Sequence, residues 1–272
     1  MKEALPIHIL PGTRFLASDQ RLSFGEHSIN HRIDFYAIIW FTEDQHEHFI
    51  DFEPFPIRKN LVYLIAEKQV HAIPSHSLPN ARVIVFSSDF FYSIEEIQLR
   101  QLFLPFENEG IQIPAEMVTP LESLFSLILL EYHGSSDFNL LSKYTATLLL
   151  HLYRFSSRPL SAVSNRDSRM VRLLQLIQLH FKEQKPVSFY AQQIGLTPKR
   201  INEILKEVAE VTISQLCHQL LLLESKRMLF NEALSIKEIA YQLSFSDQSY
   251  FSRFFKKYTS TTPEKFRAKT AK

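Results

Sequence analysis

The chain has 272 residues, more than the ~100 to 200 of a usual domain, so we expect two domains with a core in each. Hydrophobic residues make up 45% of the sequence and aromatic residues 12%, enough to build such cores. No apolar run approaches the roughly 18 residues that a membrane span needs, and the N-terminus lacks the apolar block of a signal peptide. These features predict a cytoplasmic protein that does not enter a membrane.

The net charge of +1 hides a difference between two parts of the chain. Residues 1 to 164 hold 12 Lys and Arg against 19 Asp and Glu, whereas residues 165 to 272 hold 18 against 10. The first part therefore carries −7 and the second +8, which sum to +1. A basic domain lowers its free energy on nucleic acid because it displaces counterions from phosphates. The charge division favours a nucleic-acid binder with a separate acidic module, and a merely solvated basic surface is the alternative.

Residues 1 to 94 contain short apolar runs that are rich in β-branched and aromatic side chains. FYAIIWF at 35–41, LVYLIA at 61–66 and RVIVF at 82–86 are typical of strands. HFIDF at 48–52 also begins as a strand, and we expect Pro54 and Pro56 to break it. Several short strands at close spacing predict a barrel or a sandwich.

Residues 115 to 156 change to a helical period, which GSSD interrupts once. Apolar side chains recur every three or four residues on both sides of this break, which predicts a helical hairpin. The apolar ridge of the hairpin either covers the barrel or meets the same ridge of a second chain, and the pattern leaves both open. The stretch SSRPLSAVSN at 156–165 clusters serines around a proline and is expected to be a linker. The ridge consists of Met117, Leu121, Leu124, Ile128, Tyr132, Leu141, Tyr144, Leu148, Leu152 and Phe155.

The basic part is helical throughout and contains two segments with the layout helix, tight turn, helix. In the first segment VSFYAQQIGL supplies the leading helix, Gly195 permits the turn, Thr197 can cap and Pro198 suits the first helical position. The following helix, KRINEILKEV, places its aliphatic side chains on one face and its polar side chains on the others. The polar side chains can reach a groove of DNA, and we take them as candidate contacts: Lys199, Arg200, Asn202, Glu203 and Lys206.

In the second segment LSIKEIAYQL leads, Ser246 is a plausible cap, and DQSYFSRFFKKY follows. Phe251, Phe254 and Phe255 cannot all be solvated, so this helix must pack with its aromatic residues. The polar residues of its first turns can offer donors and acceptors to base edges, while the lysines neutralise phosphates. An amphipathic helix with a charged solvent face is the alternative for either segment. The candidate contacts are Asp247, Gln248, Ser249, Ser252, Arg253, Lys256 and Lys257.

A helix over about residues 213 to 230 is expected to join the two segments. At ~1.5 Å per residue its roughly 18 residues span about 27 Å, near the ~34 Å between successive turns of the major groove. One monomer could therefore read two adjacent turns. Cys217, the only cysteine, lies among apolar neighbours in this helix and is expected to be a buried thiol rather than a nucleophile.

The stretch LSIKEIAYQLSFSDQSYFSRFFKKYTSTTPEKFR closely resembles the C-terminal signature of the AraC/XylS transcriptional regulators. PVSFYAQQIGLTPKRINEILKEV lies where that family places its first helix-turn-helix, so the resemblance covers about residues 166 to 272. HFIDF and QVHAI resemble, more loosely, parts of the family's cupin-like sensor barrel. The family usually has Gly where this chain has Glu210, Ser244 and Ser260, so we expect a strained turn wherever the conformation is kept. Many relatives also carry an arginine where this chain has Leu220.

The resemblance implies a multidomain α+β protein. Residues 1–158 would form a cupin-like ligand-sensing and dimerisation domain, a β-barrel with a helical hairpin, and residues 166–272 an all-α AraC-type DNA-binding domain with two helix-turn-helix motifs. It implies a ligand-responsive, sequence-specific transcription regulator that is not an enzyme and needs no cofactor. The implied partners are double-stranded promoter or operator DNA, an unknown small-molecule effector, a second copy of the chain and RNA polymerase. Trp40, His48, Tyr63 and His71 are the candidate effector contacts.

A metal-dependent cupin enzyme with an accessory helical domain is the alternative hypothesis. His46, Glu47, His48, Glu53 and His71 resemble a partial set of histidine and carboxylate ligands. The His-x-His spacing also puts the first two imidazoles on one face of a strand. The glycine-bounded cupin motifs are absent, however, and barrels of the AraC/XylS family are usually metal-free. We therefore predict no metal site.

Overall fold

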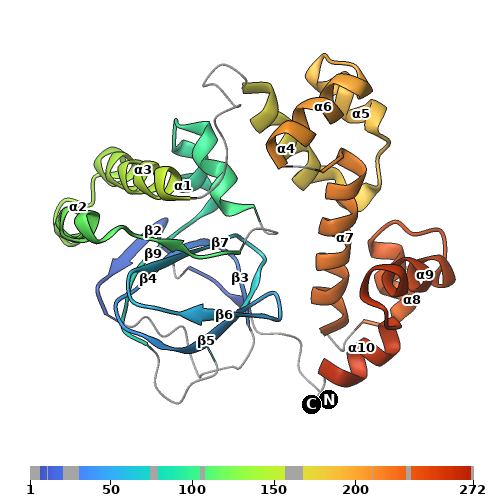
Figure 1. Ribbon diagram of the computed structural model, residues 1–272, viewed down its shortest axis with the longest axis horizontal. Helices are drawn as coiled ribbons and strands as arrows, with labels where there is room; N and C mark the ends of the chain where they lie inside the picture. The colour runs from blue at the N-terminus through green and yellow to red at the C-terminus, as the bar shows by residue number, and fades with distance from the viewer. Residues whose placement is uncertain are drawn as a thin grey trace. The chain divides into compact units, whose positions relative to one another are not determined.

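The computed structural model describes residues 7–10, 12–20, 31–73, 79–104, 108–156, 168–209, 211–230 and 234–270. Residues 6–158 form one compact unit and residues 159–272 belong to a second. The described strands all lie in the first unit, and the described part of the second is helical (Figure 1). The predicted fold class, a multidomain α+β protein, is therefore confirmed. The predicted linker at 156–165 lies almost entirely outside the described residues.

In the residues that the structure describes, two five-stranded sheets make up the barrel of the first unit. One sheet has the order β1 (Ile7–His8), β3 (His31–Ile33), β8 (Val70–Ala72), β5 (Gln45–Ile50), β6 (Glu53–Ile57). The other has the order β10 (Ile111–Gln112), β7 (Leu61–Ile65), β4 (Tyr36–Phe41), β9 (Ala81–Phe86), β2 (Phe15–Ser18). The apolar runs at 35–41, 61–66 and 82–86 thus form the three central strands of the second sheet, as predicted.

Pro54 and Pro56 do not break the strand as expected. Strand β5 ends at Ile50, the chain turns through two residues with positive φ angles, and both prolines lie inside β6. Strand β6 is the edge of its sheet, so one side of the strand has no neighbouring strand to pair with. Proline lacks a backbone N–H, and at an edge its missing donor can face that unpaired side without breaking the hydrogen-bond ladder. The two prolines stand opposite Phe49 and Glu47 of β5.

Alternate side chains of the second sheet enter two separate cores, because successive residues of a strand point to opposite faces. Ile39 and Phe41 of β4 face the barrel interior together with Tyr63 of β7. Ile38 and Trp40 of the same strand point the other way. There they join a core to which helices α1 (Ser88–Ser93), α2 (Ala115–His133) and α3 (Phe138–Phe155) contribute, beside the 3-10 helix η1 (Ile97–Phe103).

The helical hairpin predicted at 115–156 is formed by α2 and α3. Leu121, Ile128, Leu141 and Leu148 of its apolar ridge are buried in the core against the outer face of the second sheet. Of the two possibilities that the sequence left open for the ridge, the structure shows the one in which it covers the barrel. The large apolar side chains that the hairpin leaves exposed are other leucines.

The second unit contains α4 (Ser168–His180), the 3-10 helix η3 (Phe181–Glu183), α5 (Val187–Ile194), α6 (Pro198–Ala209), α7 (Ile213–Phe230), α8 (Ile236–Gln242), α9 (Gln248–Thr259) and α10 (Pro263–Thr270). Helix α7 stands between the pair α5 and α6 and the pair α8 and α9 (Figure 1). Its bounds agree with the joining helix predicted at 213–230. Cys217 is buried in it, with Sγ 3.8 Å from the hydroxyl of Tyr190, and burial raises the pKa of the thiol.

No helix within the described parts of the chain is both long and apolar enough to span a bilayer.

Candidate nucleic-acid interface

The first helix-turn-helix is built by α5 and α6. Gly195 ends α5 with a φ of 71°, the left-handed conformation that favours glycine. Thr197 Oγ1 accepts a hydrogen bond from the backbone N–H of Arg200 at 3.2 Å, and Pro198 is the first residue of α6. The turn, the cap and the helix start therefore lie where the sequence predicts them.

The second helix-turn-helix is built by α8 and α9. Ser235 and Glu238 form a capping box at the start of α8. At the start of α9 the cap is Asp247, whose Oδ1 accepts from the N–H of Tyr250 at 2.7 Å. The expected cap, Ser246, instead donates from Oγ to Asp247 Oδ2 at 3.2 Å. The prediction of Ser246 was wrong because, although serine and aspartate are both good caps, the backbone places Asp247 directly before α9.

Two serines occupy the positions where related sequences usually have glycine. Ser244, in the turn between α8 and α9, has a φ of 56°, and Ser260, at the end of α9, has a φ of 59°. Both keep the left-handed conformation, which costs a residue with a Cβ about 1–2 kcal/mol. The strain expected at these two turns is confirmed, whereas Glu210 lies outside the described residues.

Helix α6 separates core from candidate contacts. Ile201 and Leu205 are fully buried, while Lys199, Arg200 and Lys206 are exposed. The other two candidates of this helix, which are half-buried, bind within the protein. Asn202 Oδ1 accepts from the N–H of Ile213 at 3.0 Å, at the start of α7. Glu203 forms ion pairs with Arg200 at 3.3 Å and with Lys199 at 4.0 Å.

Helix α9 shows the same division. Phe251 and Phe255 are fully buried in a core that also holds Leu221 and Leu229 of α7. The pKa of Asp247 is lowered, chiefly because its carboxylate accepts the backbone hydrogen bond from Tyr250. Ser252 is half-buried, and the remaining predicted contacts lie exposed along the helix: Gln248, Ser249, Arg253, Lys256 and Lys257.

Two of the cations on α9 lie beside tyrosine rings. The guanidinium of Arg253 is 5.8 Å from the ring centroid of Tyr250, and the ammonium of Lys257 is 5.4 Å from that of Tyr258. These contacts direct the stems of both side chains along the helix surface. Arg253 lies two turns before the C-terminal end of α9, whereas Lys257 lies in its last turn.

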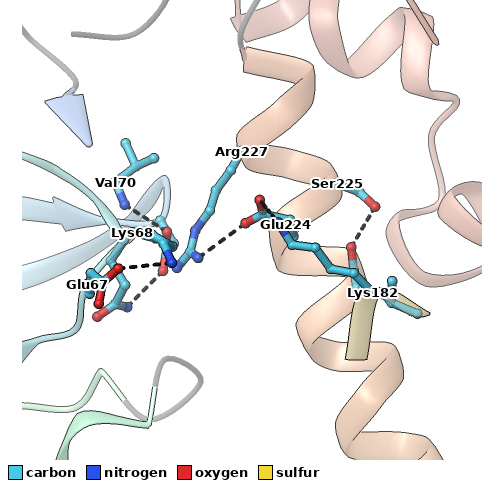
Figure 2. A network of polar contacts seen from close by, with 10 residues as sticks. Glu67, Lys68, Val70, Lys182, Glu224, Ser225 and Arg227 are labelled. Atoms are coloured by element: carbon cyan, nitrogen blue, oxygen red, sulfur yellow. Dashed lines mark hydrogen bonds and ion pairs between the residues drawn. The ribbon is translucent and has the colours of Figure 1, made fainter. Parts of the chain in front are cut away.

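A charged group on α7 was missed by sequence reasoning. Glu224 is 4% exposed and accepts from Lys182 Nζ at 2.8 Å, with Arg227 Nη1 3.5 Å from its other carboxylate oxygen (Figure 2). One turn of α7 thus carries a carboxylate and a guanidinium among apolar residues. The signal in the sequence was this acid–base pair at i and i+3 inside the run LLLESKRMLF.

Three of the four candidate effector contacts meet inside the barrel. His48 Nδ1 lies 3.4 Å from His71 Nε2, and the rings of His48 and Tyr63 have centroids 4.1 Å apart. Burial lowers the pKa of His48 to about 3 and that of His71 well below its usual value. The hydroxyl of Tyr63 donates to the carbonyl of Pro56 at 2.7 Å.

The fourth candidate, Trp40, is not brought together with the other three. Its ring faces the core shared with the hairpin, where Arg82 lies over it with the guanidinium carbon 4.7 Å from the ring centroid. Its Nε1 donates to Asn60 Oδ1 at 3.3 Å. Trp40 therefore lies on the opposite side of the second sheet from His48, Tyr63 and His71.

Two further histidines extend the group inside the barrel, and the sequence reasoning missed both. His8, His31, His71 and His48 come from β1, β3, β8 and β5, which are neighbours in that order in the first sheet. The centroids of successive rings are 4.0, 5.4 and 5.5 Å apart. His31 stands directly opposite His71 in the strand pairing. Strands β1 and β3 have only two and three residues, too few for a recognisable pattern.

The ligand set of the cupin-enzyme hypothesis is not assembled. Glu47 and Glu53 are exposed, whereas His48 and His71 are buried, so these carboxylates do not join the two imidazoles. The side chain of His46 is outside what the structure describes. Within the described residues no group of three or more His, Cys, Asp or Glu side chains is placed to hold a metal ion.

Comparison with known proteins agrees with the two helix-turn-helix units. A family model for a helix-turn-helix domain matches residues 190–269. The chain is 25% identical over 252 residues to the HTH-type transcriptional activator RhaR of Mannheimia succiniciproducens, covering 89% of this chain and 88% of that protein. It is 24% identical over 263 residues to the HTH-type transcriptional activator RhaS of Escherichia coli O81, covering 94% and 93%.

Among solved structures, ToxT from Vibrio cholerae O395 is 16% identical, with a TM-score of 0.46, over 93% of this chain and 97% of that one. The RhaR and RhaS alignments span nearly the whole chain, and the family model covers both helix-turn-helix units almost completely. The sequence signature, the duplicated motif and these matches agree with one another. The helix-turn-helix model and these two activators support an AraC/XylS family transcriptional regulator.

Proposed function

We propose that this DNA-binding transcription regulator reads two adjacent segments of the major groove, one with α6 and one with α9. The observation that carries the proposal is α7, a single helix of 18 residues that joins the two helix-turn-helix units. At ~1.5 Å per residue it is about 27 Å long, close to the ~34 Å between successive turns of the groove on one face of DNA. A link of this length supports simultaneous binding at both turns.

The exposed side chains of the two reading helices suit different parts of double-stranded DNA. In the proposal, Arg253, Gln248 and Ser249, with the neighbouring Ser252, contact base edges, because they lie in the first turns of α9 and offer both donors and acceptors. Lysine ammonium groups, as point charges, bind phosphates. Lys199, Arg200 and Lys206 of α6 contact the other segment of the groove. Lys256 and Lys257 of α9 contact the phosphate backbone beside the segment that α9 reads.

Asn202, Glu203 and Asp247 have a different role in this proposal, although the sequence suggested DNA contacts for all three. Asn202 caps α7, Glu203 orients Arg200, and Asp247 caps α9. An amide or carboxylate oxygen that already accepts a backbone hydrogen bond is held in place, and a carboxylate repels phosphate. These residues would therefore set the geometry of the reading helices.

We propose that the barrel interior binds a small-molecule effector through His48, His71 and Tyr63. Buried neutral imidazoles offer one donor and one acceptor each, which suits a polar, uncharged ligand group. Trp40 is left out of this set because it lies in the other core. The regulator would act in the cytoplasm at promoter or operator DNA, with RNA polymerase as its partner and with no catalytic step.

We also propose that the chain dimerises through the hairpin. Leu127 and Leu130 on α2 and Leu140 and Leu150 on α3 are 45%, 71%, 44% and 37% exposed, and they offer apolar area that a second copy of the chain could cover. A charged residue at the buried Leu121 or Leu148 would unfold the hairpin with or without a partner. Leu130→Asp avoids this confusion, because a monomer can solvate the new carboxylate.

Sedimentation over a range of concentrations tests the dimer. Leu130→Asp should shift the chain to monomer without lowering its thermal stability, whereas Ser135→Asp, an exposed change in the turn between the two helices, should leave the dimer intact. A folded wild-type chain that stays monomeric at high micromolar concentration would rule the dimer out.

DNA binding by the second unit alone is the direct test of the proposed function. We expect a fragment of residues 166–272 to fold and to bind DNA with an affinity that falls as salt rises. If about six phosphates are neutralised, the slope of log K against log salt is about −5. A fragment of residues 1–158 is the control and should not bind. A folded 166–272 fragment without salt-sensitive affinity would contradict the proposal.

Selection of bound sequences from random DNA would then identify the operator. Repeating the selection with the full chain, with and without cell extract, tests whether a small molecule changes the affinity. Loss of that change in His48→Gln would support the barrel interior as the effector site. An effect of extract that persists in His48→Gln and in Tyr63→Phe would place the effector elsewhere.

A further inference from the structure

A short segment that precedes the first helix-turn-helix binds to the second one. Phe181, the first residue of η3, packs against the core that α7 shares with α8 and α9, which includes Leu229, Leu243 and Phe251. Gln184, the residue after η3, donates from Nε2 to the carbonyl oxygen of Leu243 at 2.7 Å. Since α5 begins at Val187, the segment that leads into the first helix-turn-helix is attached to the second helix-turn-helix.

The same segment also binds α7. Lys182 Nζ donates to Glu224 Oε1 at 2.8 Å, and the glutamate side chain is only 6% exposed (Figure 2). An ion pair with one well-buried partner is screened less by salt than a surface pair. Residues 181–184 therefore contact both the joining helix and the far helix-turn-helix.

The carbonyl that Gln184 binds has a special position. Leu243 is the C-terminal cap of α8, and the turn with the strained Ser244 follows it before α9 begins. A helix-end carbonyl lacks a partner within its helix, so a side chain that donates to it holds the helix end in place. Gln184 is itself held, because it has a left-handed φ of 51° and its N–H donates to the carbonyl of Phe181 at 3.2 Å.

Two connections constrain orientation more than one does. Helix α7 alone fixes the distance between the two helix-turn-helix motifs, but a bend or a rotation at either of its ends would change the angle between α6 and α9. A second attachment beside α7 opposes that rotation. On DNA the angle matters, because one base pair turns the groove by about 35°.

We infer that residues 181–184 form a strut that fixes the angle between the two reading helices and thereby sets the spacing of the operator's two half-elements. Lys182 and Gln184 are positioning residues in this inference, which rests on the proposed function of α6 and α9. Neither side chain needs to touch DNA. Their effect is on which spacing is preferred rather than on the affinity of either helix for its own half-element.

The test uses the full chain and an operator selected from random DNA. Gln184→Asn keeps the amide and tolerates the left-handed conformation, but its side chain is one methylene too short to reach Leu243. Lys182→Gln removes the charge that pairs with Glu224. Lys185→Gln is the matched control, since Lys185 belongs to the same stretch and its described contacts are local: an ion pair with Glu183 at 3.1 Å and a position 5.7 Å from the ring centroid of Phe189.

Affinities are measured for the operator and for versions with one base pair inserted or deleted between the half-elements. We expect the wild type and Lys185→Gln to lose about tenfold or more on either change, similar to the loss of a base contact. The double variant Lys182→Gln/Gln184→Asn should lose less than about threefold, and its affinity for a single half-element should stay close to wild type.

The outcomes separate the strut from a structural contribution. If the double variant weakens binding to all spacings by the same factor, or keeps the wild-type ratio between spacings, the inference is wrong. Far-UV circular dichroism checks folding, and if the double variant is unfolded, Gln184→Asn alone carries the same comparison. A wild type that selects no DNA overturns the proposed function. A wild type that binds but tolerates every spacing leaves that function standing and overturns the strut.

Discussion

The barrel interior and helices α6 and α9 of the helical unit handle polar side chains in opposite ways. The barrel buries them: His48 and His71 lie inside it as neutral imidazoles, and Gln69 is bound on both sides, donating to Asp51 Oδ2 at 2.8 Å and accepting from the N–H of Ala66 at 2.6 Å. A buried polar group must be hydrogen-bonded or neutral, since its desolvation otherwise destabilises the fold. The barrel interior therefore holds polar side chains as well as apolar ones.

On α6 and α9 the helical unit instead keeps its cations in water, although it buries Glu224 and Arg227 on α7. The side chain of Lys199 is 88% exposed, and Arg253, Lys256 and Lys257 of α9 are exposed as well. Its cores are formed by aliphatic and aromatic residues such as Ile201 and Phe251. The barrel thus encloses polar side chains, whereas α6 and α9 present their cations to solvent, and each of the following changes should affect one unit and spare the other.

The largest effect is expected for Phe251→Ala. Deleting a fully buried phenylalanine ring should lower the free energy of unfolding of the helical unit by about 3–5 kcal/mol. Trp40, the only tryptophan, reports on the barrel by fluorescence, while far-UV circular dichroism is dominated by the helices. The midpoint of the unfolding transition should fall when it is followed by dichroism and should stay unchanged when it is followed by fluorescence. Tyr250→Ala, at a ring that is 49% exposed, is the control. Transitions that move together would show that the units unfold as one.

Acid should destabilise the barrel first. The pKa of His48 is about 3 in the folded chain and about 6.5 when unfolded, so its stabilising contribution is complete above pH 6.5 and is lost as the pH falls toward 3. At pH 5 this costs about 2 kcal/mol, and His71 adds a loss of the same sign. Denaturant titrations at pH 7 and pH 5, followed by Trp40 fluorescence, measure this loss of barrel stability. His48→Gln should show a smaller pH dependence, and a barrel equally stable at both values would contradict the burial of neutral histidines.

Arg253→Ala and Lys257→Ala should separate base-specific contacts from contacts with the phosphate backbone within the helical unit. Loss of the arginine should cost about 1–3 kcal/mol on the operator and relax the preference at one base position. Loss of the lysine should weaken all sequences alike and reduce the salt slope by about one unit. Affinities for single-base variants of the operator across salt concentrations distinguish the two. If Arg253→Ala weakens every variant equally, specificity belongs to Lys199 and Arg200 of α6.

The smallest effect concerns the two turns of the helical unit, where Gly195 and Ser244 have nearly the same backbone conformation. Ser244→Gly removes the strain of a Cβ but increases the freedom of the unfolded chain, for a net gain of about 0.5–1 kcal/mol. Gly195→Ser should lose a similar amount by strain alone, because no atom lies within 4 Å of an added Cβ. Dichroism-monitored unfolding measures both changes. Effects of the same sign would show that the two turns are not equivalent.

Much of the helical unit could be predicted because its determinants are local. The period of apolar residues, Gly195 with Thr197 and Pro198, and the unbroken run from 213 to 230 each specify a helix, a turn or a cap within a few neighbours. The central strands of the barrel were predictable for the same reason. Ser246 and Asp247 show the limit of such reasoning, since both are good caps and only the backbone path selected the second.

Contacts between distant segments could not be predicted in this way. The alternation along β4 indicates that Trp40 and Ile39 face opposite sides, but it does not indicate which of them shares a side with Tyr63. That depends on the register, in which Ile39 stands opposite Tyr63 and Trp40 opposite Val62. The prolines of β6 are tolerated because that strand is an edge, and being an edge is a property of the assembled sheet.

The sequence by itself determined the helix-turn-helix units, the joining helix and the exposed basic residues of α6 and α9, because periodicity, capping and charge act over a few residues. Only the tertiary structure decided that four histidines from four strands meet inside the barrel, since strand order and register bring them together. It also decided that Gln184 binds Leu243, 59 residues away. Such contacts depend on how the elements pack, and no local pattern encodes which distant partner a polar side chain will find.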